Sequence, residues 1–157
     1  MSKTAVYAGT FDPITNGHVD IIERGLKIFD KLIIAVASTP KKALFSAEER
    51  VDMIKQVTKG MNVEVESFDG LLVNFVKKKN CNVTIRGLRA ISDFEYEFQM
   101  AHMNRKQNKD IDSVYVMTSQ KYSFLSSSVV KEVAMLKGNI KDFVPEIVEN
   151  KLKEKFE

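Results

Sequence analysis

Near its N-terminus the chain reads Gly9-Thr10-Phe11-Asp12-Pro13-Ile14-Thr15-Asn16-Gly17-His18, between a β-branched run over residues 4–8 and an amphipathic segment. A strand, a glycine-containing turn and a helix start in this order bring unpaired backbone N–H groups and the positive end of a helix dipole to one point. The two glycines let the backbone approach a ligand, and His18 adds a polar ring at the helix entrance. The stretch therefore predicts a phosphate site, although it lacks the Walker A lysine and the three-glycine dinucleotide fingerprint.

The size and composition of the chain are those of one globular domain. It has 157 residues, 44% of them hydrophobic, and a mean hydropathy of -0.18. The longest apolar run, over residues 32–37, is far too short to cross a bilayer, and no secretion signal is recognised. The single cysteine, Cys81, fits a reducing compartment, so we expect a cytoplasmic protein. The 24 basic and 21 acidic residues are well mixed, and we expect neither a nucleic-acid nor a membrane partner.

Short β-branched runs alternate with helical periodicity along the whole chain, without an internal repeat or a flexible linker. The expected strands cover residues 4–8, 32–37, 62–66, 82–85 and 113–117, with a helical pattern in each interval. Such alternation indicates a parallel sheet covered on both faces. We therefore predict an α/β protein with a single-domain Rossmann-like doubly wound fold, in which helices flank a five-stranded parallel sheet and residues 1–157 form one domain.

Helix boundaries and faces can be read from local patterns. Ser46 with Glu49, and Ser92 with Glu95, have the spacing of a capping box. Apolar stripes predict core-facing helices over about residues 19–29 and from residue 46 onward, and the same reasoning turns Phe94, Phe98 and Ala101 toward the core. A final helix is expected after residue 145. Its charged face and the lysine run 77–79 are interpreted as solvated surfaces.

Each unusual polar cluster directly follows one of the expected strands. The clusters are residues 9–18, Lys41-Lys42, Arg86-Gly87-Leu88-Arg89 in an expected loop, and residues 123–128. The carboxyl ends of parallel strands share one edge of the sheet, where ligands bind in open α/β folds. The clusters are therefore expected to converge on one ligand site.

Each cluster also has a structural interpretation. His18 fits an anion donor but could be satisfied locally at the helix start, and the two arginines suit phosphate binding but are common on surfaces. The serines at 126–128 can cap a helix, bind phosphate or do both. Neither interpretation is favoured for Lys41, Lys42 and Glu97, whereas His102 is interpreted as structural or interfacial.

Taken together, these residues resemble the bacterial phosphopantetheine adenylyltransferase family of the nucleotidyltransferase superfamily, which carries a T/H-x-G-H signature. The likeness covers essentially the whole chain. It is carried by Gly9-Thr10-Phe11-Asp12-Pro13, Thr15-Asn16-Gly17-His18, residues 45–50, Ile85-Arg86-Gly87-Leu88-Arg89-Ala90, Asp93-Phe94-Glu95-Tyr96-Glu97 and Tyr122-Ser123-Phe124-Leu125-Ser126-Ser127-Ser128.

The resemblance implies transfer of AMP from ATP to 4'-phosphopantetheine, with Mg2+ accompanying ATP, in a cytoplasmic homohexamer. It implies that ATP is contacted by Thr10, Phe11, His18, Gly87, Leu88, Arg89, Glu97, Tyr122, Ser123, Phe124, Leu125, Ser126, Ser127 and Ser128. It implies that the pantetheine substrate is held by Thr10, Lys41, Leu72 and Arg86. The choice of Lys41 over Lys42 depends on counting back from Phe45, because the chain is one residue shorter here than some relatives. The role of Lys131 stays open.

The residue types suit this chemistry. A phosphate nucleophile is already anionic, so the reaction needs positioning and charge stabilisation rather than a catalytic triad. The expected catalytic residues are His18 and Thr10 at the α-phosphate, Lys41 at the incoming phosphate and Arg89 at the leaving phosphates. No structural metal is expected, because no acidic or histidine cluster has metal-ligand spacing.

Two kinds of alternative remain. Another enzyme of the superfamily, such as a cytidylyltransferase or a nicotinamide mononucleotide adenylyltransferase, would share most of the motifs. A catalytically silent nucleotide-binding regulator or an RNA-binding module is disfavoured, because the basic residues are not interleaved with exposed aromatic residues.

Overall fold

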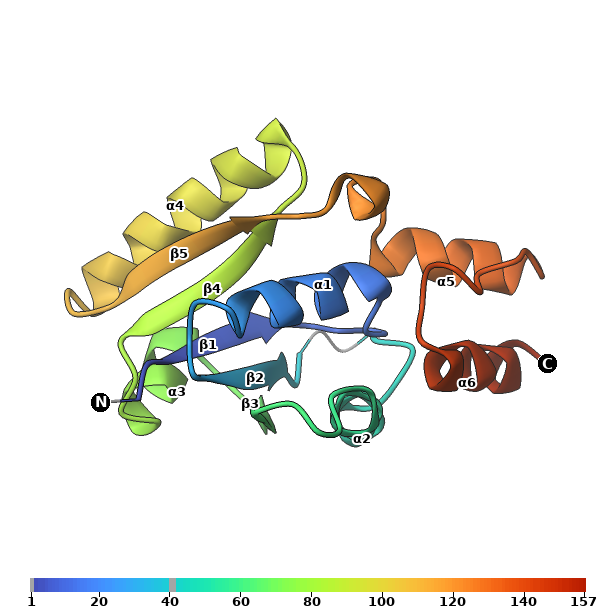
Figure 1. Cartoon of the computed structure of the whole chain (residues 1–157), viewed down its shortest axis with the longest axis horizontal. Coiled ribbons are helices and arrows are strands. Elements are labelled where there is room, and N and C mark those ends of the chain that lie inside the picture. The colour runs from blue at the N-terminus through green and yellow to red at the C-terminus, as the bar shows by residue number, and fades with distance from the viewer. Residues whose placement is uncertain (1, 40–41) are drawn as a thin grey trace.

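A computed structural model describes residues 2–39 and 42–157, except for the side chains of residues 91 and 92. These residues contain five strands, each followed by a helix, and six α-helices in all, of which α5 and α6 come last (Figure 1). In order, they are β1 (Thr4–Gly9), α1 (Asn16–Gly25), β2 (Lys31–Ala37), α2 (Ala47–Val57), β3 (Val63–Phe68), α3 (Leu72–Lys78), β4 (Val83–Leu88), α4 (Ile91–Gln107), β5 (Asp112–Met117), the 3-10 turn η1 (Gln120–Tyr122), α5 (Ser127–Met135) and α6 (Glu146–Phe156).

The five strands form one parallel sheet in the order β3-β2-β1-β4-β5. The chain therefore moves outward from β1 to β3, crosses back to β4 and moves outward again to β5. The direction reverses between β1 and β4, and in doubly wound sheets ligands bind beyond the strand ends at this point. The predicted α/β, Rossmann-like fold with five parallel strands is confirmed.

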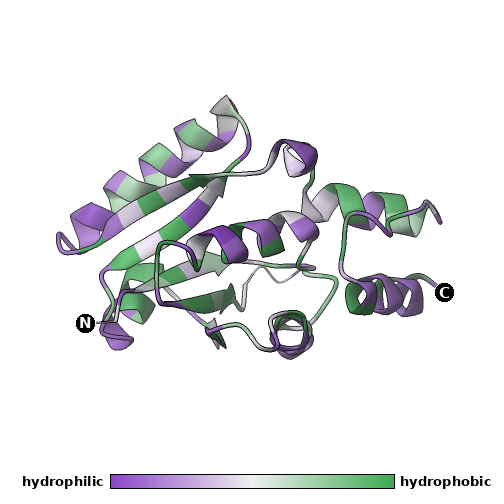
Figure 2. Ribbon diagram, in the orientation of Figure 1, coloured by the Kyte–Doolittle hydropathy of each residue, from purple (hydrophilic) through white to green (hydrophobic). Residues whose placement is uncertain are grey.

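Alternating strand residues supply the two faces of the core. Ala5, Tyr7 and Ile34 pack on the face that also receives buried residues of α1, α2, α5 and α6. On the other face, Val6 and Ile33 pack against buried residues of α3. Because both faces are covered, the central strands are nearly continuously apolar, as Figure 2 shows.

Strand β4 extends further than expected. The segment Arg86-Gly87-Leu88 was predicted to be a loop, but it pairs with residues 115–117 of β5 and is a strand. A Cβ at Gly87 would come within 2.7 Å of Ile21 Cγ1, so glycine is needed there for α1 to lie against β4. Strand pairing thus fixes the direction of the Arg86 side chain.

Two predicted helix boundaries are confirmed and others differ. Ser46 and Glu49 form the expected capping box, and α6 begins directly after Pro145. By contrast, α1 covers Asn16–Gly25 rather than about 19–29, and α4 begins at Ile91 with Ala90 at its N-cap, so the predicted Ser92 cap is wrong.

Helix α4 does not bury the face that was predicted to be buried. Phe94 and Phe98 are 52% and 53% exposed; their rings contact each other, and the ring of Phe98 lies edge-on to that of exposed His102. Lys79 was also predicted to be solvated, but it pairs with Glu64 and Glu66. The apolar pattern of Phe94 and Phe98 therefore marks an outer surface of the chain, because α4 buries few of its side chains against the sheet.

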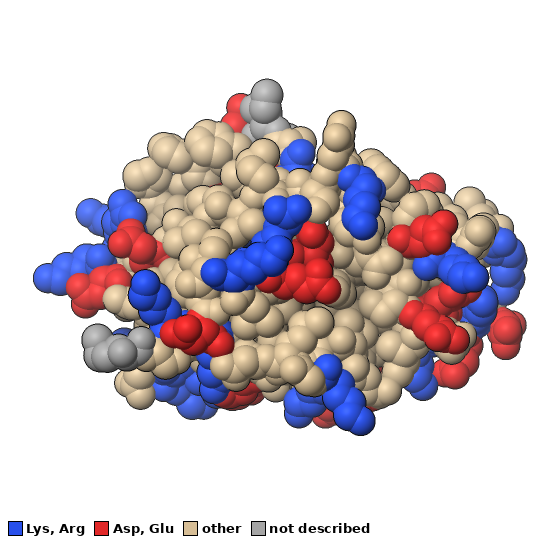
Figure 3. Space-filling model, viewed as in Figure 1, with Lys and Arg blue, Asp and Glu red and all other residues tan. Residues whose placement is uncertain are grey.

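Charges of both signs are interspersed on the face of the molecule drawn in Figure 3. In the part of the chain that the structure describes, no helix has the length and apolar character needed to cross a bilayer.

Candidate active site

The turn between β1 and α1 is held by its own backbone and by the core. Phe11 has a φ of 49°, and its ring is 2% exposed and lies edge-on to Tyr7. Thr15 is the N-cap of α1 and accepts a hydrogen bond from the His18 backbone. The predicted strand, turn and helix start are therefore present, with α1 beginning beside the end of β1.

His18 closes a capping box that sequence reasoning missed. Its Nδ1 accepts a hydrogen bond from the Thr15 backbone N–H at 2.9 Å. Since a backbone N–H only donates, Nδ1 is unprotonated and the ring proton is on Nε2. Burial of the ring, with the nearby charges of Arg86 and Arg89, lowers the pKa of His18 to about 3. His18 is thus a neutral donor, and its ring packs at 4.9 Å from that of Phe11.

Arg86 lies in the C-terminal half of β4, and its side chain lines both cavities described below. Its Nε and Nη2 donate to Glu97 Oε1 at 3.0 and 2.5 Å, and its Nη1 donates to the Ala8 carbonyl at 2.6 Å. Burial disfavours the charged guanidinium, but the hydrogen bond and charge of Glu97 outweigh this effect and raise the pKa of Arg86. Glu97 is 7% exposed, so its carboxylate is an anchor for Arg86 rather than a solvated group.

Arg89 follows β4 and is held in the same manner. Its Nε and Nη2 donate to the two carboxylate oxygens of Asp93 at 3.0 and 3.1 Å. Its Nη1 donates to the Leu125 carbonyl at 2.8 Å. The two arginines are therefore oriented by carboxylates of α4, one helical turn apart.

The serine-rich segment after β5 begins α5 and joins the turn after β1. Ser126 caps α5 by accepting from the Val129 backbone N–H at 3.2 Å, as one of the two interpretations predicts. Ser127 Oγ donates to the Pro13 carbonyl at 2.7 Å. By contrast, Ser123 Oγ donates to the Gln120 carbonyl within its own turn. Phe124 is 61% exposed, and its ring lies edge-on to that of Phe143.

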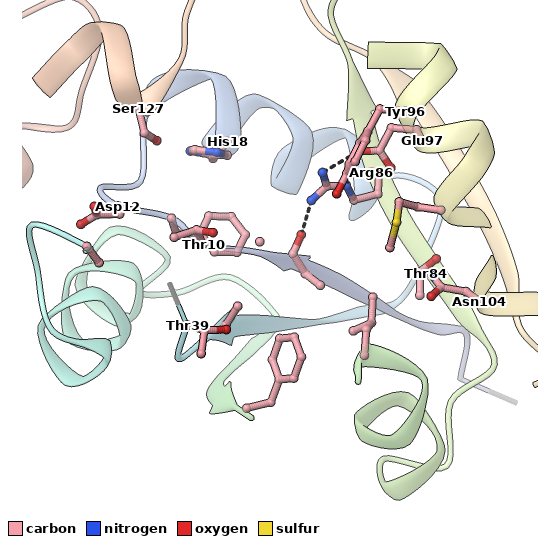
Figure 4. Close-up of a pocket in the computed structure, with 18 of the residues that line it drawn as sticks. Thr10, Asp12, His18, Thr39, Thr84, Arg86, Tyr96, Glu97, Asn104 and Ser127 are labelled. Atoms are coloured by element: carbon pink, nitrogen blue, oxygen red, sulfur yellow. Dashed lines mark hydrogen bonds and ion pairs between the residues drawn. The ribbon is translucent and has the colours of Figure 1, made fainter. Parts of the chain in front are cut away.

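Two adjoining cavities collect most of the predicted residues. A cavity of about 800 Å³ extends from His18, past Arg86, between the sheet and α4 toward Asn104 (Figure 4). A second, of about 240 Å³, lies beside α1 and the segment after β5. Among the described residues, both cavities are lined by His18, Arg86, Glu97 and Ser127.

The predicted residues divide between these cavities. Thr10, Phe11, Leu72 and Ser128 line the larger one, and Gly87, Arg89, Tyr122, Leu125 and Ser126 line the smaller one. Leu88, Ser123 and Phe124 line neither. Lys42 lines the larger cavity, whereas Lys41 lies outside the described residues, so the choice between the two lysines is not tested.

Arg50 is a structural centre of the site that sequence reasoning missed. It is 1% exposed, and its Nη1 donates to the carbonyls of Thr10 and Ala37 at 2.7 and 2.8 Å. Its Nε donates to the Phe45 carbonyl at 3.1 Å, and burial lowers its pKa. A sequence signal exists, because residue 50 lies at helical spacing from buried residues 53 and 54.

Asp12 was also missed, and it explains the position of Lys131. The Asp12 carboxylate accepts from the backbone N–H groups of Leu44 and Phe45, each at 2.9 Å, and from Lys131 Nζ at 2.7 Å. Burial opposes ionisation of Asp12, but these donors lower its pKa. The pair ties α5 to the turn after β1 and sets Lys131 in the wall of the larger cavity.

The site is rich in donors for anionic oxygen and poor in metal ligands. Within the described residues, no group of three histidine, cysteine, aspartate or glutamate side chains could hold a metal ion. A neutral imidazole at a helix start, two oriented guanidinium groups and a capped helix at the end of one sheet are suited to bind phosphates.

Comparisons with known proteins agree with this geometry. A family profile described as cytidylyltransferase-like matches residues 6–133. "Phosphopantetheine adenylyltransferase" of Thermodesulfovibrio yellowstonii is 58% identical over 159 residues, which cover 99% of both chains. The protein of that name from Caldanaerobacter subterraneus subsp. tengcongensis is 54% identical over 98% of both chains.

The fold has solved counterparts at low sequence identity. A bifunctional NMN adenylyltransferase/ADP ribose pyrophosphatase of Francisella tularensis, solved with AMP and a manganese ion, superposes with a TM-score of 0.71 at 19% identity. The match covers 98% of this chain and 49% of that one. At this identity the likeness concerns the fold alone.

Proposed function

The chain belongs to the phosphopantetheine adenylyltransferase family, and from this premise we propose that its two cavities align ATP and 4'-phosphopantetheine for direct in-line transfer of AMP. A phosphate oxygen of 4'-phosphopantetheine attacks the α-phosphorus of ATP. The bond from that phosphorus to the bridging oxygen breaks, so that pyrophosphate leaves and dephospho-coenzyme A remains. We treat residues 1–157 as one catalytic domain.

The observation that carries this proposal is the position of His18 in the wall of both cavities. A donor shared by two adjoining cavities can bind the α-phosphate where the two reactants meet. Nε2 is free to donate because Nδ1 is engaged with Thr15. A neutral donor of this kind, together with Thr10, would stabilise the charge that builds on the α-phosphate oxygens.

The smaller cavity suits the nucleotide. Arg89 and the capped start of α5 at Ser126 and Ser127 would hold the phosphates that leave as pyrophosphate. We place the rest of the nucleotide along Gly87, Leu88, Glu97 and the segment 122–128. Phe11 would support the turn between β1 and α1 from behind.

The larger cavity suits the acceptor. Thr10, Arg86 and Leu72 line it, and we place the acceptor phosphate beside Thr10 and Arg86. A lysine of the 41–42 pair would complete the site for the acceptor phosphate, with Lys41 as our choice. Because the nucleophile is anionic, no general base is required and no covalent enzyme intermediate forms.

Mg2+ would enter this site with ATP. The described residues gather no three carboxylate or imidazole ligands, so triphosphate oxygens and water would provide most of its coordination. The ion would neutralise the leaving phosphates, while the protein residues orient them.

The exposed apolar stripe of α4 supports a homohexamer. Phe94, Phe98 and Met103 are each more than half exposed in the single chain. Such an apolar surface is typical of an interface. Light scattering coupled to gel filtration should give six times the mass of the chain, and Phe98→Asp should yield smaller species.

A pyrophosphate-release assay tests the proposed activity. Purified protein is mixed with Mg2+, with either ATP or CTP, and with one acceptor. The acceptors are 4'-phosphopantetheine, nicotinamide mononucleotide and phosphorylated substrates of cytidylyltransferases. Release with ATP and 4'-phosphopantetheine, with dephospho-coenzyme A identified by mass spectrometry, is expected. Preference for CTP or for nicotinamide mononucleotide would contradict the proposed substrates.

A further inference from the structure

Asp20 has a set of contacts that the proposed chemistry does not use. It lies on α1, two residues after His18, and its side chain is 13% exposed. Its Oδ2 accepts from the Ser119 backbone N–H at 3.0 Å, and its Oδ1 accepts from Ser119 Oγ at 2.9 Å. Both oxygens also accept from Arg24 Nε at 3.1 Å. The carboxylate thus joins α1 to the segment that follows β5.

Arg24 completes this cluster. Its Nη2 donates to Ser119 Oγ at 2.7 Å, so Ser119 both donates to the carboxylate and accepts from the guanidinium. Burial opposes ionisation of Asp20, but the Ser119 and Arg24 donors outweigh it and lower the pKa of Asp20. Hydrogen bonds to a charged acceptor are stronger than neutral ones, so the connection between Asp20 and Ser119 is stronger than a neutral hydrogen bond within a turn.

The tie continues through the backbone to the nucleotide side of the site. The Ser119 carbonyl accepts from the Tyr122 N–H at 2.9 Å, and the Tyr122 carbonyl accepts from the Leu125 N–H at 3.0 Å. The Leu125 carbonyl in turn accepts from Arg89 Nη1 at 2.8 Å. A continuous series of hydrogen bonds therefore leads from Asp20 to the Arg89 guanidinium.

We propose that Asp20 is a positioning residue for ATP, because it fixes the turn over residues 119–125 whose last carbonyl orients Arg89. Asp20 lines neither cavity, so it acts through Ser119 rather than by touching a substrate. Because it concerns the ATP side of adenylyl transfer, this role rests on the proposed function. His18 and Asp20 lie on the same helix, so α1 positions both the proposed α-phosphate donor and the turn over residues 119–125.

The other attachments of this segment limit the expected effect. Thr118 donates its N–H to the Leu88 carbonyl, and Ser127 Oγ donates to the Pro13 carbonyl. Both ends of the segment therefore stay attached when Asp20 is changed, and only its middle relaxes. The result should be weaker ATP binding and not a loss of the fold.

The test compares Asp20→Ala, Asp20→Asn and Ser119→Ala with the parent. Asp52→Asn is the matched control, because Asp52 is a helical carboxylate whose partner is Gln56 on its own helix. For each protein, KM for ATP, KM for 4'-phosphopantetheine and kcat are measured by pyrophosphate release. The Kd for ATP alone is measured by calorimetry, and unfolding is followed by circular dichroism.

We expect Asp20→Ala to raise both the KM and the Kd for ATP about tenfold, which corresponds to about 1.4 kcal/mol. KM for 4'-phosphopantetheine should stay within about twofold of the parent. Asp20→Asn retains an acceptor for Ser119 and should recover part of the loss, and Ser119→Ala should give a smaller loss. Asp52→Asn should match the parent.

A parent-like ATP Kd in folded Asp20→Ala would overturn the proposal, as would an equal rise in both KM values. If Asp20→Ala does not fold, an unchanged ATP Kd in both Asp20→Asn and Ser119→Ala would overturn it. If the parent itself releases no pyrophosphate, the proposed function fails. Calorimetry with ATP then still decides the role of Asp20.

Discussion

His18 has two separable tasks in this structure, and two substitutions distinguish them. Nδ1 accepts the Thr15 backbone N–H and so takes part in the capping box of α1, whereas Nε2–H is the donor that we propose for the α-phosphate. Asparagine places an oxygen close to the position of Nδ1, so His18→Asn keeps this acceptor and removes the outer donor. His18→Ala removes both.

The two tasks should appear in two different measurements. Loss of one donor to a developing oxyanion costs on the order of 10² to 10³ in rate, so kcat should fall by about that factor in both variants. Thr15 still caps α1 in both variants, but loss of the acceptor for the Thr15 N–H costs about 1 kcal/mol, which is a decrease of about 3 °C in Tm for a domain of this size. We therefore expect this decrease in His18→Ala and a parent-like Tm in His18→Asn.

The assays are pyrophosphate release at saturating substrates and thermal unfolding at matched concentrations. Calorimetric ATP binding provides a check that the nucleotide still reaches the site. Activity of His18→Asn within about tenfold of the parent would refute the assignment of Nε2–H to the reaction. Equal Tm losses in the two variants would refute the assignment of Nδ1 to the capping box.

Three further outcomes follow from the site. In His102→Gln protein, which leaves one histidine, nitrogen NMR should find His18 neutral with its proton on Nε2 from pH 8 to 5, because its pKa is about 3. Since this pKa lies below that of His18 in the unfolded chain, the contribution of His18 to stability is present above about pH 6.5 and is lost as the pH falls toward 3. An imidazolium signal with a midpoint near pH 6.5 would contradict the lowered pKa. Lys41→Ala should raise KM for 4'-phosphopantetheine more than Lys42→Ala, and the reverse order would move the assignment to Lys42. Arg50→Met, followed by urea unfolding, should lose about 3 kcal/mol because the carbonyls of Thr10, Ala37 and Phe45 lose a donor, and a loss below about 1 kcal/mol would contradict that role.

Local patterns predicted the sheet well, because buried parallel strands and capped helices have strong sequence signals. The capping box at Ser46 and the alternation of strands with helices follow from such signals, whereas the strand order comes from the structure. The same reasoning failed for Phe94 and Phe98, since helical periodicity identifies an apolar stripe without saying whether the core or an outer surface lies against it.

The partners within the site could not be predicted in the same way. Arg86 and Glu97 are eleven positions apart, and their contact depends on where α4 lies against β4. Asp12 and Arg50 lie in motifs recognised in the sequence, but only the tertiary structure shows which amides and carbonyls they satisfy. Most of the predicted site residues line the two cavities, whereas the groups that orient them could not be predicted.

Arg86 and Arg89, which line the cavities, each already have a carboxylate neighbour: Glu97 for Arg86 and Asp93 for Arg89. A phosphate bound as we propose would share a cation instead of meeting a bare one, and its attraction would be moderated. After pyrophosphate left, the cation would remain paired and in place, so no rearrangement would have to follow. Such sharing would favour rapid turnover over tight retention of products.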